Sequence, residues 1–95
     1  MTDVTLLLLT SLADGPKHGY AMQHDIEDFA GVRLGPGTLY GAISRLEDEG
    51  LIAPLETEDR RKPYQITRQG RSELQQRAAQ LGQIMQQIVK RLNPA

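Results

Sequence analysis

The spacing of apolar residues predicts two helices in the first third of the chain. The first runs from Asp3 to Ala13, where Asp3 can cap the N-terminus and leucines cover more than one face. Leucine on several sides indicates that this helix lies between the core and a further packing partner. The second helix runs from about Tyr20 to Phe29 and ends at Gly31. Residues 32–34 then read as a short extended piece.

A third helix is predicted from about Pro36 to Glu49, with clear signals at both ends. Pro36 suits the first turn, where its missing N–H is not needed. Gly50 stands where helices end in a left-handed residue, so Leu51 can fold back on Leu46 in a Schellman-type contact. One face of this helix is apolar and carries Leu39, Ile43 and Leu46 at positions i, i+4 and i+7.

After Gly50 the apolar period changes from helical to alternating. Residues 51–56 and 62–67 read as two strands joined by the polar segment 57–61, and the proline in each strand indicates a small, edge-like hairpin. A long fourth helix starts near Thr67, which can cap it, and continues to about Leu92.

This order of elements predicts a mainly α fold with a small β-hairpin, a winged helix-turn-helix with a long C-terminal dimerisation helix. Within one domain, residues 1–67 would form the DNA-binding part and residues 68–95 the dimerisation helix. The third helix of such a fold enters the major groove, and the hairpin loop, or wing, reaches a flanking phosphate or the minor groove.

The composition excludes several classes of protein. A chain of 95 residues is enough for one small domain. It has no cysteine, which excludes a disulfide framework, a thiolate nucleophile and a zinc finger. The longest wholly apolar run, Leu6 to Leu9, is far too short to span a membrane, and no signal peptide is visible. We therefore expect a cytoplasmic protein with no membrane partner.

The net charge of −1 argues at first against a nucleic-acid partner. The distribution of charge changes this, because residues 60–71 carry five bases and no acid. Distant acids are screened beyond about 8 Å at physiological salt, so a segregated basic stretch is compatible with DNA. On charge alone, an ordinary solvated charged surface is as good an interpretation as a DNA-binding one.

The face of the third helix opposite its apolar stripe has an unusual composition. Gly41 inside a helix costs about 1 kcal/mol relative to alanine, which close approach to another surface would explain. Arg45 can pair with guanine or a phosphate, although pairing with Glu49 or Asp48 is an ordinary alternative. Because residues 47–49 are acidic, only the half from Gly37 to Arg45 should lie in the groove. The candidate DNA contacts on this helix are Gly37, Thr38, Tyr40, Gly41, Ser44 and Arg45.

The predicted wing carries a second candidate cluster, Arg60-Arg61-Lys62. No apolar residue anchors these bases, so they can reach a phosphate track. The alternative is a loop that neutralises itself through Glu56, Glu58 and Asp59.

The last helix carries an apolar seam whose members are 4, 3, 4, 3 and 4 residues apart, which is typical of a coiled coil. A monomer would leave the far end of this seam exposed to solvent. We therefore expect a homodimer in which the last helix and the leucine-rich first helix pack against a second copy of the chain. The alternative is a last helix that folds back along its own domain. Two-fold symmetry would then predict a pseudo-palindromic operator. The expected dimer contacts are Leu6, Leu9, Leu74, Ala78, Leu81, Met85, Ile88 and Leu92.

The chain resembles the PadR family of winged-helix transcriptional regulators over roughly residues 6–82. The matching stretches are LLLLTSLADGPKHGYAMQHDI, GPGTLYGAISRLEDEGLI and RRKPYQITRQG. The resemblance implies a homodimer formed through the first and last helices, usually a repressor. It also places near DNA the residues Tyr20, Thr38, Tyr40, Ser44 and Arg45, with Arg60, Arg61 and Lys62 on the wing.

The chain departs from this family pattern in three respects. Its tail is one helix, as in the short-tailed subgroup, and it lacks a glycine common at the wing tip. It also has no tryptophan, so the drug-binding pore of some members is not carried over. Whether a small-molecule effector exists stays open.

An enzyme or a metal sensor would need a constellation that the sequence lacks. His18 and His24 are six residues apart, which does not place them on one helical face, and no nucleophile lies near them. We therefore expect no catalytic residues, no metal and no cofactor. The main alternative is a winged helix used for protein–protein interaction without DNA, which the net acidity favours and the basic wing opposes.

Overall fold

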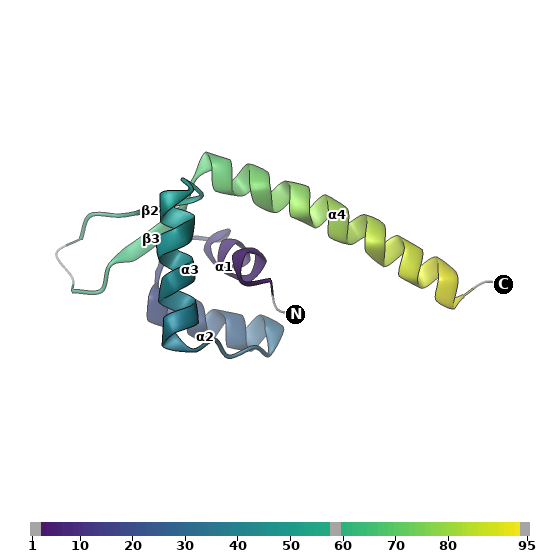
Figure 1. Ribbon diagram of the computed structural model, residues 1–95, viewed down its shortest axis with the longest axis horizontal. Helices are drawn as coiled ribbons and strands as arrows, with labels where there is room; N and C mark the ends of the chain where they lie inside the picture. Colours follow the sequence, from purple (N-terminus) through teal and green to yellow (C-terminus); the bar gives the residue numbers. More distant parts are fainter. Residues whose placement is uncertain (1–2, 58–59, 94–95) are drawn as a thin grey trace.

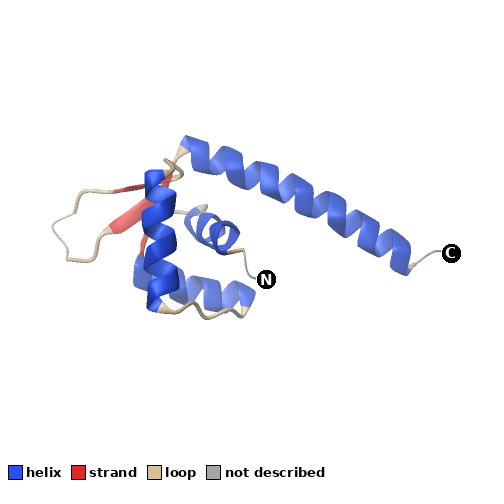
Figure 2. Cartoon of the chain, in the orientation of Figure 1, coloured by secondary structure: helices blue, strands red, loops and turns tan. Residues whose placement is uncertain are grey.

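The computed structural model describes residues 3–57 and 60–93 and shows a helical unit on a small sheet, with one long helix extending away (Figures 1 and 2). The long helix makes the molecule elongated, with extents of 59 × 26 × 20 Å. The elements in chain order are α1 (Val4–Leu12), β1 (Lys17–His18), α2 (Gly19–Ala30), α3 (Pro36–Asp48), β2 (Ile52–Pro54), β3 (Pro63–Ile66) and α4 (Arg68–Leu92).

Side-chain caps begin three of the helices. The Asp3 carboxylate accepts the backbone N–H of Leu6 at 3.0 Å at the start of α1. Thr67 accepts the N–H of Gly70 at 3.0 Å at the start of α4, so both expected caps are confirmed. His18 caps α2 through Nδ1, which requires the proton on Nε2 while this nitrogen accepts.

The end of α3 has the predicted Schellman geometry. Gly50 adopts a left-handed φ of 77°. The N–H of Leu51 donates to the carbonyl of Leu46 at 2.9 Å, and the N–H of Gly50 donates to that of Glu47 at 3.0 Å. The helix therefore stops where the sequence indicates, and the chain turns directly into β2.

The sheet differs from the prediction in where its third strand comes from. Residues 32–34 are not a strand; the N–H of Leu34 instead donates to the Gln23 side chain at 3.2 Å. The third strand is β1, which pairs antiparallel with β3, and the strand order is β1-β3-β2. A two-residue strand is too short to show any periodicity, which is why the alternation of apolar residues misses it.

The two hairpin strands are also shorter than predicted. The N–H of Leu51 donates to the carbonyl of Leu46 at the end of α3, and the side chain of Thr67 caps α4. The N–H of Thr67 donates to the carbonyl of Leu51 at 3.1 Å, so these two residues lie just beyond the ends of β2 and β3. Pro63 is tolerated in the central strand because it is the first residue of β3.

The core gathers around α1, which packs against α2, α3 and α4. Leu9 is fully buried within the chain's own core, whereas Leu6 is only partly covered. The buried apolar residues are Leu8, Leu9, Leu12, Met22, Ile26, Leu34, Leu39, Ala42, Ile43, Leu46, Leu51 and Ile52.

The base of α4 is fixed to the rest of the chain by close packing and ion pairs. A Cβ at Gly70 would overlap the carbonyl oxygen of Leu51, so only glycine allows this approach. Further along, Arg77 pairs with Asp3 at 2.6 Å and with Glu73 at 3.0 Å. Leu74 still packs on the core, but residues 78–93 are exposed. Within the described residues, no helix has the length and apolarity needed to cross a membrane.

Candidate nucleic-acid interface

The outer face of α3 carries small and hydroxyl side chains, as the 100° spacing of a helix predicts. Leu39, Ala42, Ile43 and Leu46 are buried on the inner face. The remaining candidates on the N-terminal half are all exposed: Gly37, Thr38, Tyr40, Gly41 and Ser44. These residues therefore form one accessible surface on α3.

Neither glycine on this face is explained by contacts within the chain. A Cβ added at Gly37 or Gly41 would meet nothing within 4 Å, and neither residue has a positive φ. Alanine would fit both positions and favour the helix. The absence of a side chain thus has no reason inside the described part of the protomer, which favours close approach by an external surface.

Arg45 is held by two partners on the side of α3 that faces α1. Its Nη1 donates to Glu49 at 3.0 Å and its Nη2 donates to the buried Thr5 hydroxyl at 2.8 Å. The intramolecular pair with Glu49, which the sequence left open as the alternative, is therefore present. The Arg45 side chain is still 48% exposed, and these two bonds use two of its five N–H donors, so a contact with DNA at Arg45 stays a prediction.

The start of α2 contributes aromatic side chains to the same region. Tyr20 is exposed and meets the His24 ring edge-on at a centroid distance of 4.5 Å. On the other side it stacks with the ring of His18, 6.4 Å away. Packing of this kind restricts the rotamers of an exposed phenol.

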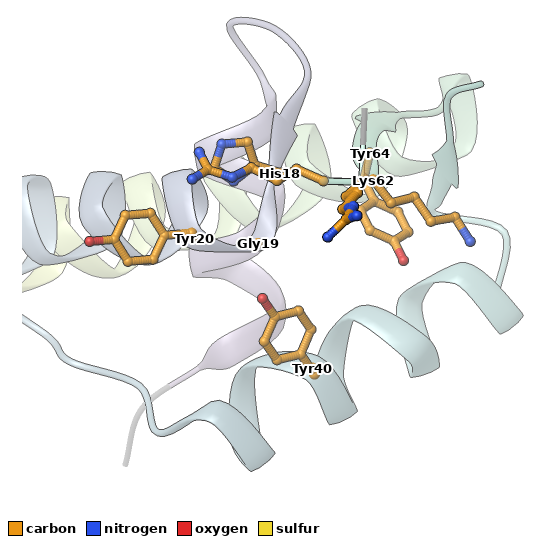
Figure 3. A pocket seen from close by; sticks show the side chains of 8 residues that line it. His18, Gly19, Tyr20, Tyr40, Lys62 and Tyr64 are labelled. Carbon is orange, nitrogen blue, oxygen red and sulfur yellow. The ribbon is translucent and has the colours of Figure 1, made fainter. Parts of the chain in front are cut away.

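A cleft of about 560 Å³ lies between the start of α2, the flank of α3 and the wing (Figure 3). Pairing of β1 with β3 places His18 opposite Pro63, which brings the residues after His18 close to those before Pro63. The cleft brings together Tyr20 and Tyr40 with all three wing bases, and no Asp or Glu is among the described residues that line it. The lining residues are His18, Gly19, Tyr20, Tyr40, Arg60, Arg61, Lys62 and Tyr64.

The wing bases are exposed, and Lys62 lies over the ring of Tyr64 with Nζ 5.7 Å from its centroid. This cation–π contact holds the aliphatic stem of Lys62 against the sheet. Of the acids that offered a self-neutralising alternative, Glu56 is exposed, whereas Glu58 and Asp59 lie outside the described residues.

Three lining residues were missed by the sequence reasoning about binding: His18, Gly19 and Tyr64. Tyr64 could have been predicted from the sequence, because the two-residue period of a strand puts it on the same face as Lys62. His18 and Gly19 carry no such signal, since their place in the cleft depends on a strand pairing of two residues.

The described residues hold no cluster of three or more His, Cys, Asp or Glu side chains suited to a metal ion. The cleft combines cations, phenols and amphipathic rings, which suits an anionic partner such as a phosphate backbone. With α3 exposed and the wing beside it, the fold and surface define a winged-helix DNA-binding protein.

The family model for the Transcriptional regulator PadR-like family matches residues 8–76. The chain therefore belongs to this family of transcriptional regulators. The family expectation drawn from the sequence is thus confirmed.

Solved structures agree with this assignment. A transcriptional regulator from Clostridium thermocellum is 28% identical with a TM-score of 0.80, covering 92% of this chain and 90% of that one. A PadR-family regulator from Eggerthella lenta is 29% identical with a TM-score of 0.79, covering 97% and 83%. F93 from STIV, described as a winged-helix DNA-binding protein, shares the fold at 20% identity, with a TM-score of 0.76 and coverage of 83% and 87%.

A curated relative is an uncharacterized 37.1 kDa protein in transposon TN4556 of Streptomyces fradiae. It is 42% identical over 92 residues, which is 97% of this chain. The chain spans only 27% of that relative's length.

Proposed function

We propose that this PadR-family regulator binds a pseudo-palindromic DNA operator as a homodimer and represses transcription in the cytoplasm. The observation that carries the proposal is the cleft that joins the exposed half of α3 to the three wing bases, with no Asp or Glu among its described lining residues. In this arrangement α3 enters the major groove and the wing contacts phosphates of the flanking backbone. Repression is the usual role that the family resemblance implies.

The exposed half of α3 would supply the contacts that distinguish sequences. Gly37 and Gly41 allow the helix backbone to approach the bases, while Thr38, Ser44 and Tyr40 offer hydroxyls to base edges or phosphates. Arg45, held by Thr5 and Glu49, would support α3 from the α1 side. Tyr20 stands at the other edge of the cleft, where a phosphate would pass.

The apolar face of α4 supports the dimer. Its large side chains are between 46% and 75% exposed, a continuous stripe that a soluble monomer rarely leaves bare: Leu81, Ile84, Met85, Ile88, Val89 and Leu92. Ala78 lies in line with them, and Leu6 is partly covered at the edge of α1. Leu9 is not included, since a fully buried side chain cannot reach a partner, and Leu74 belongs chiefly to the core contact.

Binding to a random-sequence duplex at several salt concentrations tests the DNA role. Neutralised phosphates predict that log affinity falls linearly with log salt, with a slope of about −0.9 per contact. Arg61→Ala should weaken binding to all sequences alike and make the slope shallower by about one contact. Arg91→Ala, the same change at the far end of α4, is the matched control and should leave the slope unchanged.

Absence of binding at low salt would overturn the proposal. It would favour the second candidate, a winged helix that binds another protein, which the net charge of −1 also suits. Affinity that does not respond to salt would contradict the phosphate contacts of the wing.

A further inference from the structure

Gly19 lies directly beneath the ring of Tyr40, although 21 positions separate them in the sequence. A Cβ built on Gly19 would come within 2.8 Å of both Cε1 and Oη of Tyr40 and within 3.0 Å of Cζ. Real Cβ atoms essentially never approach so closely, so the ring can lie here only because residue 19 has no side chain. Figure 3 shows the Tyr40 ring extending from α3 toward Gly19.

The backbone itself does not require glycine at this position. Gly19 is the first residue of α2 and has no positive φ. Space for a neighbour is therefore the physical reason for glycine here, and the three atoms nearest to the missing Cβ all belong to Tyr40.

The space left open at Gly19 allows an otherwise exposed phenol to adopt this orientation. Tyr40 is 54% exposed, so little else in the protomer limits its rotamer. Among the described residues no hydrogen bond uses its hydroxyl, which leaves this group available to a ligand in the cleft.

We infer that Gly19 is a positioning residue for DNA recognition, acting by leaving room for the Tyr40 phenol in the cleft between α2, α3 and the wing. This inference rests on the proposed function, because the ligand that meets Tyr40 is the DNA operator. Gly19 itself need not touch DNA. An added methyl group at residue 19 displaces the Tyr40 ring and removes its contribution to binding.

A double-mutant cycle tests the inference. The affinity for a duplex recovered by selection from a random pool is measured for wild type, Gly19→Ala, Tyr40→Ala and the double variant. Gly19→Ala should weaken binding about tenfold, the loss of roughly one good contact. In the Tyr40→Ala background, Gly19→Ala should have no further effect, because no ring remains to be displaced.

Tyr64 provides the matched control. It lines the same cleft, but none of its atoms is among the three nearest to a Cβ built on Gly19. The effects of Gly19→Ala and Tyr64→Ala should therefore multiply. Thermal unfolding of every variant checks the fold, and the double variant with Tyr40→Ala relieves the clash if Gly19→Ala alone is unstable.

Several outcomes would overturn the inference. Unchanged affinity in Gly19→Ala would show that the ring position does not matter for DNA. Effects of Gly19→Ala and Tyr40→Ala that multiply would show that Gly19 acts independently of Tyr40. If wild type itself shows no salt-dependent DNA binding, the proposed function fails and this inference fails with it; the two failures are thus distinguished by the wild-type measurement.

Discussion

Arg45 shows how a single side chain joins the outer face of α3 to the core. Its guanidinium is shared between Glu49, one turn further along α3, and the buried hydroxyl of Thr5 on α1. Thr5 is buried, so the hydrogen bond that its hydroxyl accepts from a charged donor is worth more than an exposed contact. Arg45 thereby fixes the position of α3 on the side opposite the wing.

Arg45→Ala should therefore act on stability more than on sequence preference. We expect the free energy of unfolding to fall by about 1 kcal/mol, because a half-exposed ion pair and one buried acceptor lose their partner. Urea denaturation measures this change, and selection from a random pool should yield the wild-type sequence preference. Relaxed preference at one base pair would instead mean that Arg45 contacts that base.

Lys17 links α1, β1 and α2 through one ammonium group. It pairs with Asp14 at 2.5 Å, donates to the carbonyl of Ser11, and lies 3.9 Å from Asp25. The hydrogen bond from Lys17, and next the attraction of its charge, hold the pKa of Asp14 below its ordinary value of 3.8. A depressed carboxylate pKa stabilises the fold above that ordinary value, and this contribution is lost as pH falls through the lower, folded value.

Asp14→Asn should therefore lower the melting temperature at neutral pH, and the difference from wild type should shrink as pH falls below 3.8. Thermal unfolding followed by circular dichroism across this range measures it. Asp28→Asn is the control, because Asp28 is an exposed acid with no ion pair among the described residues. A difference that is constant with pH would contradict the role of the Asp14 charge.

At the scale of elements, α4 has two parts with different roles. Its first turns are fixed to the core by Gly70, Leu74 and Arg77, whereas residues 78–93 contact nothing that covers their apolar stripe. Rigid attachment at one end and a bare apolar stripe at the other suit a helix that sets the distance between two protomers.

Ile88→Glu tests this role because it puts a charge in the middle of the stripe. We expect the dimer to dissociate roughly a hundredfold more readily, since a carboxylate would lose its hydration in the interface. Sedimentation equilibrium measures the dissociation, with Gln83→Glu as the control that adds the same charge on another face of α4. Wild type that is monomeric at all concentrations, or an unaffected Ile88→Glu dimer, would contradict the assignment.

Local signals explain which elements could be predicted from the sequence. Pro36 and Gly50 predict the start and the end of α3, and Thr67 predicts the start of α4, because each acts on only a few neighbouring residues. β1 could not be predicted, because its two residues are a strand only by pairing with β3. The cleft depends on that pairing. Its basic and aromatic residues could therefore be predicted one by one, but not that they lie together in one cleft.

The contact between Arg45 and Thr5 could not be predicted either, because it too joins residues that are far apart in the sequence. These residues are 40 positions apart, and nothing near either of them indicates the other. The pair of Arg45 with Glu49, at i and i+4 of one helix, was by contrast foreseen as an alternative.

On the scale of the whole molecule, charge is separated along the chain. Residues 1–30 carry five acids and one base, whereas the wing gathers three bases around a cleft with no acid among its described lining residues. Charges are screened beyond about 8 Å at physiological salt, so a phosphate backbone at the wing responds mainly to the charges nearest to it. A net charge of −1 is therefore consistent with DNA binding.

We propose that α4 joins two protomers so that two copies of α3 bind neighbouring turns of one duplex. Selection of bound duplexes from a random pool, followed by sequencing, tests it most directly. We predict an inverted repeat whose half-sites are centred about 10 base pairs apart, or a multiple of that spacing. Enrichment of a single, unrepeated half-site, or no enrichment at all, would contradict the account.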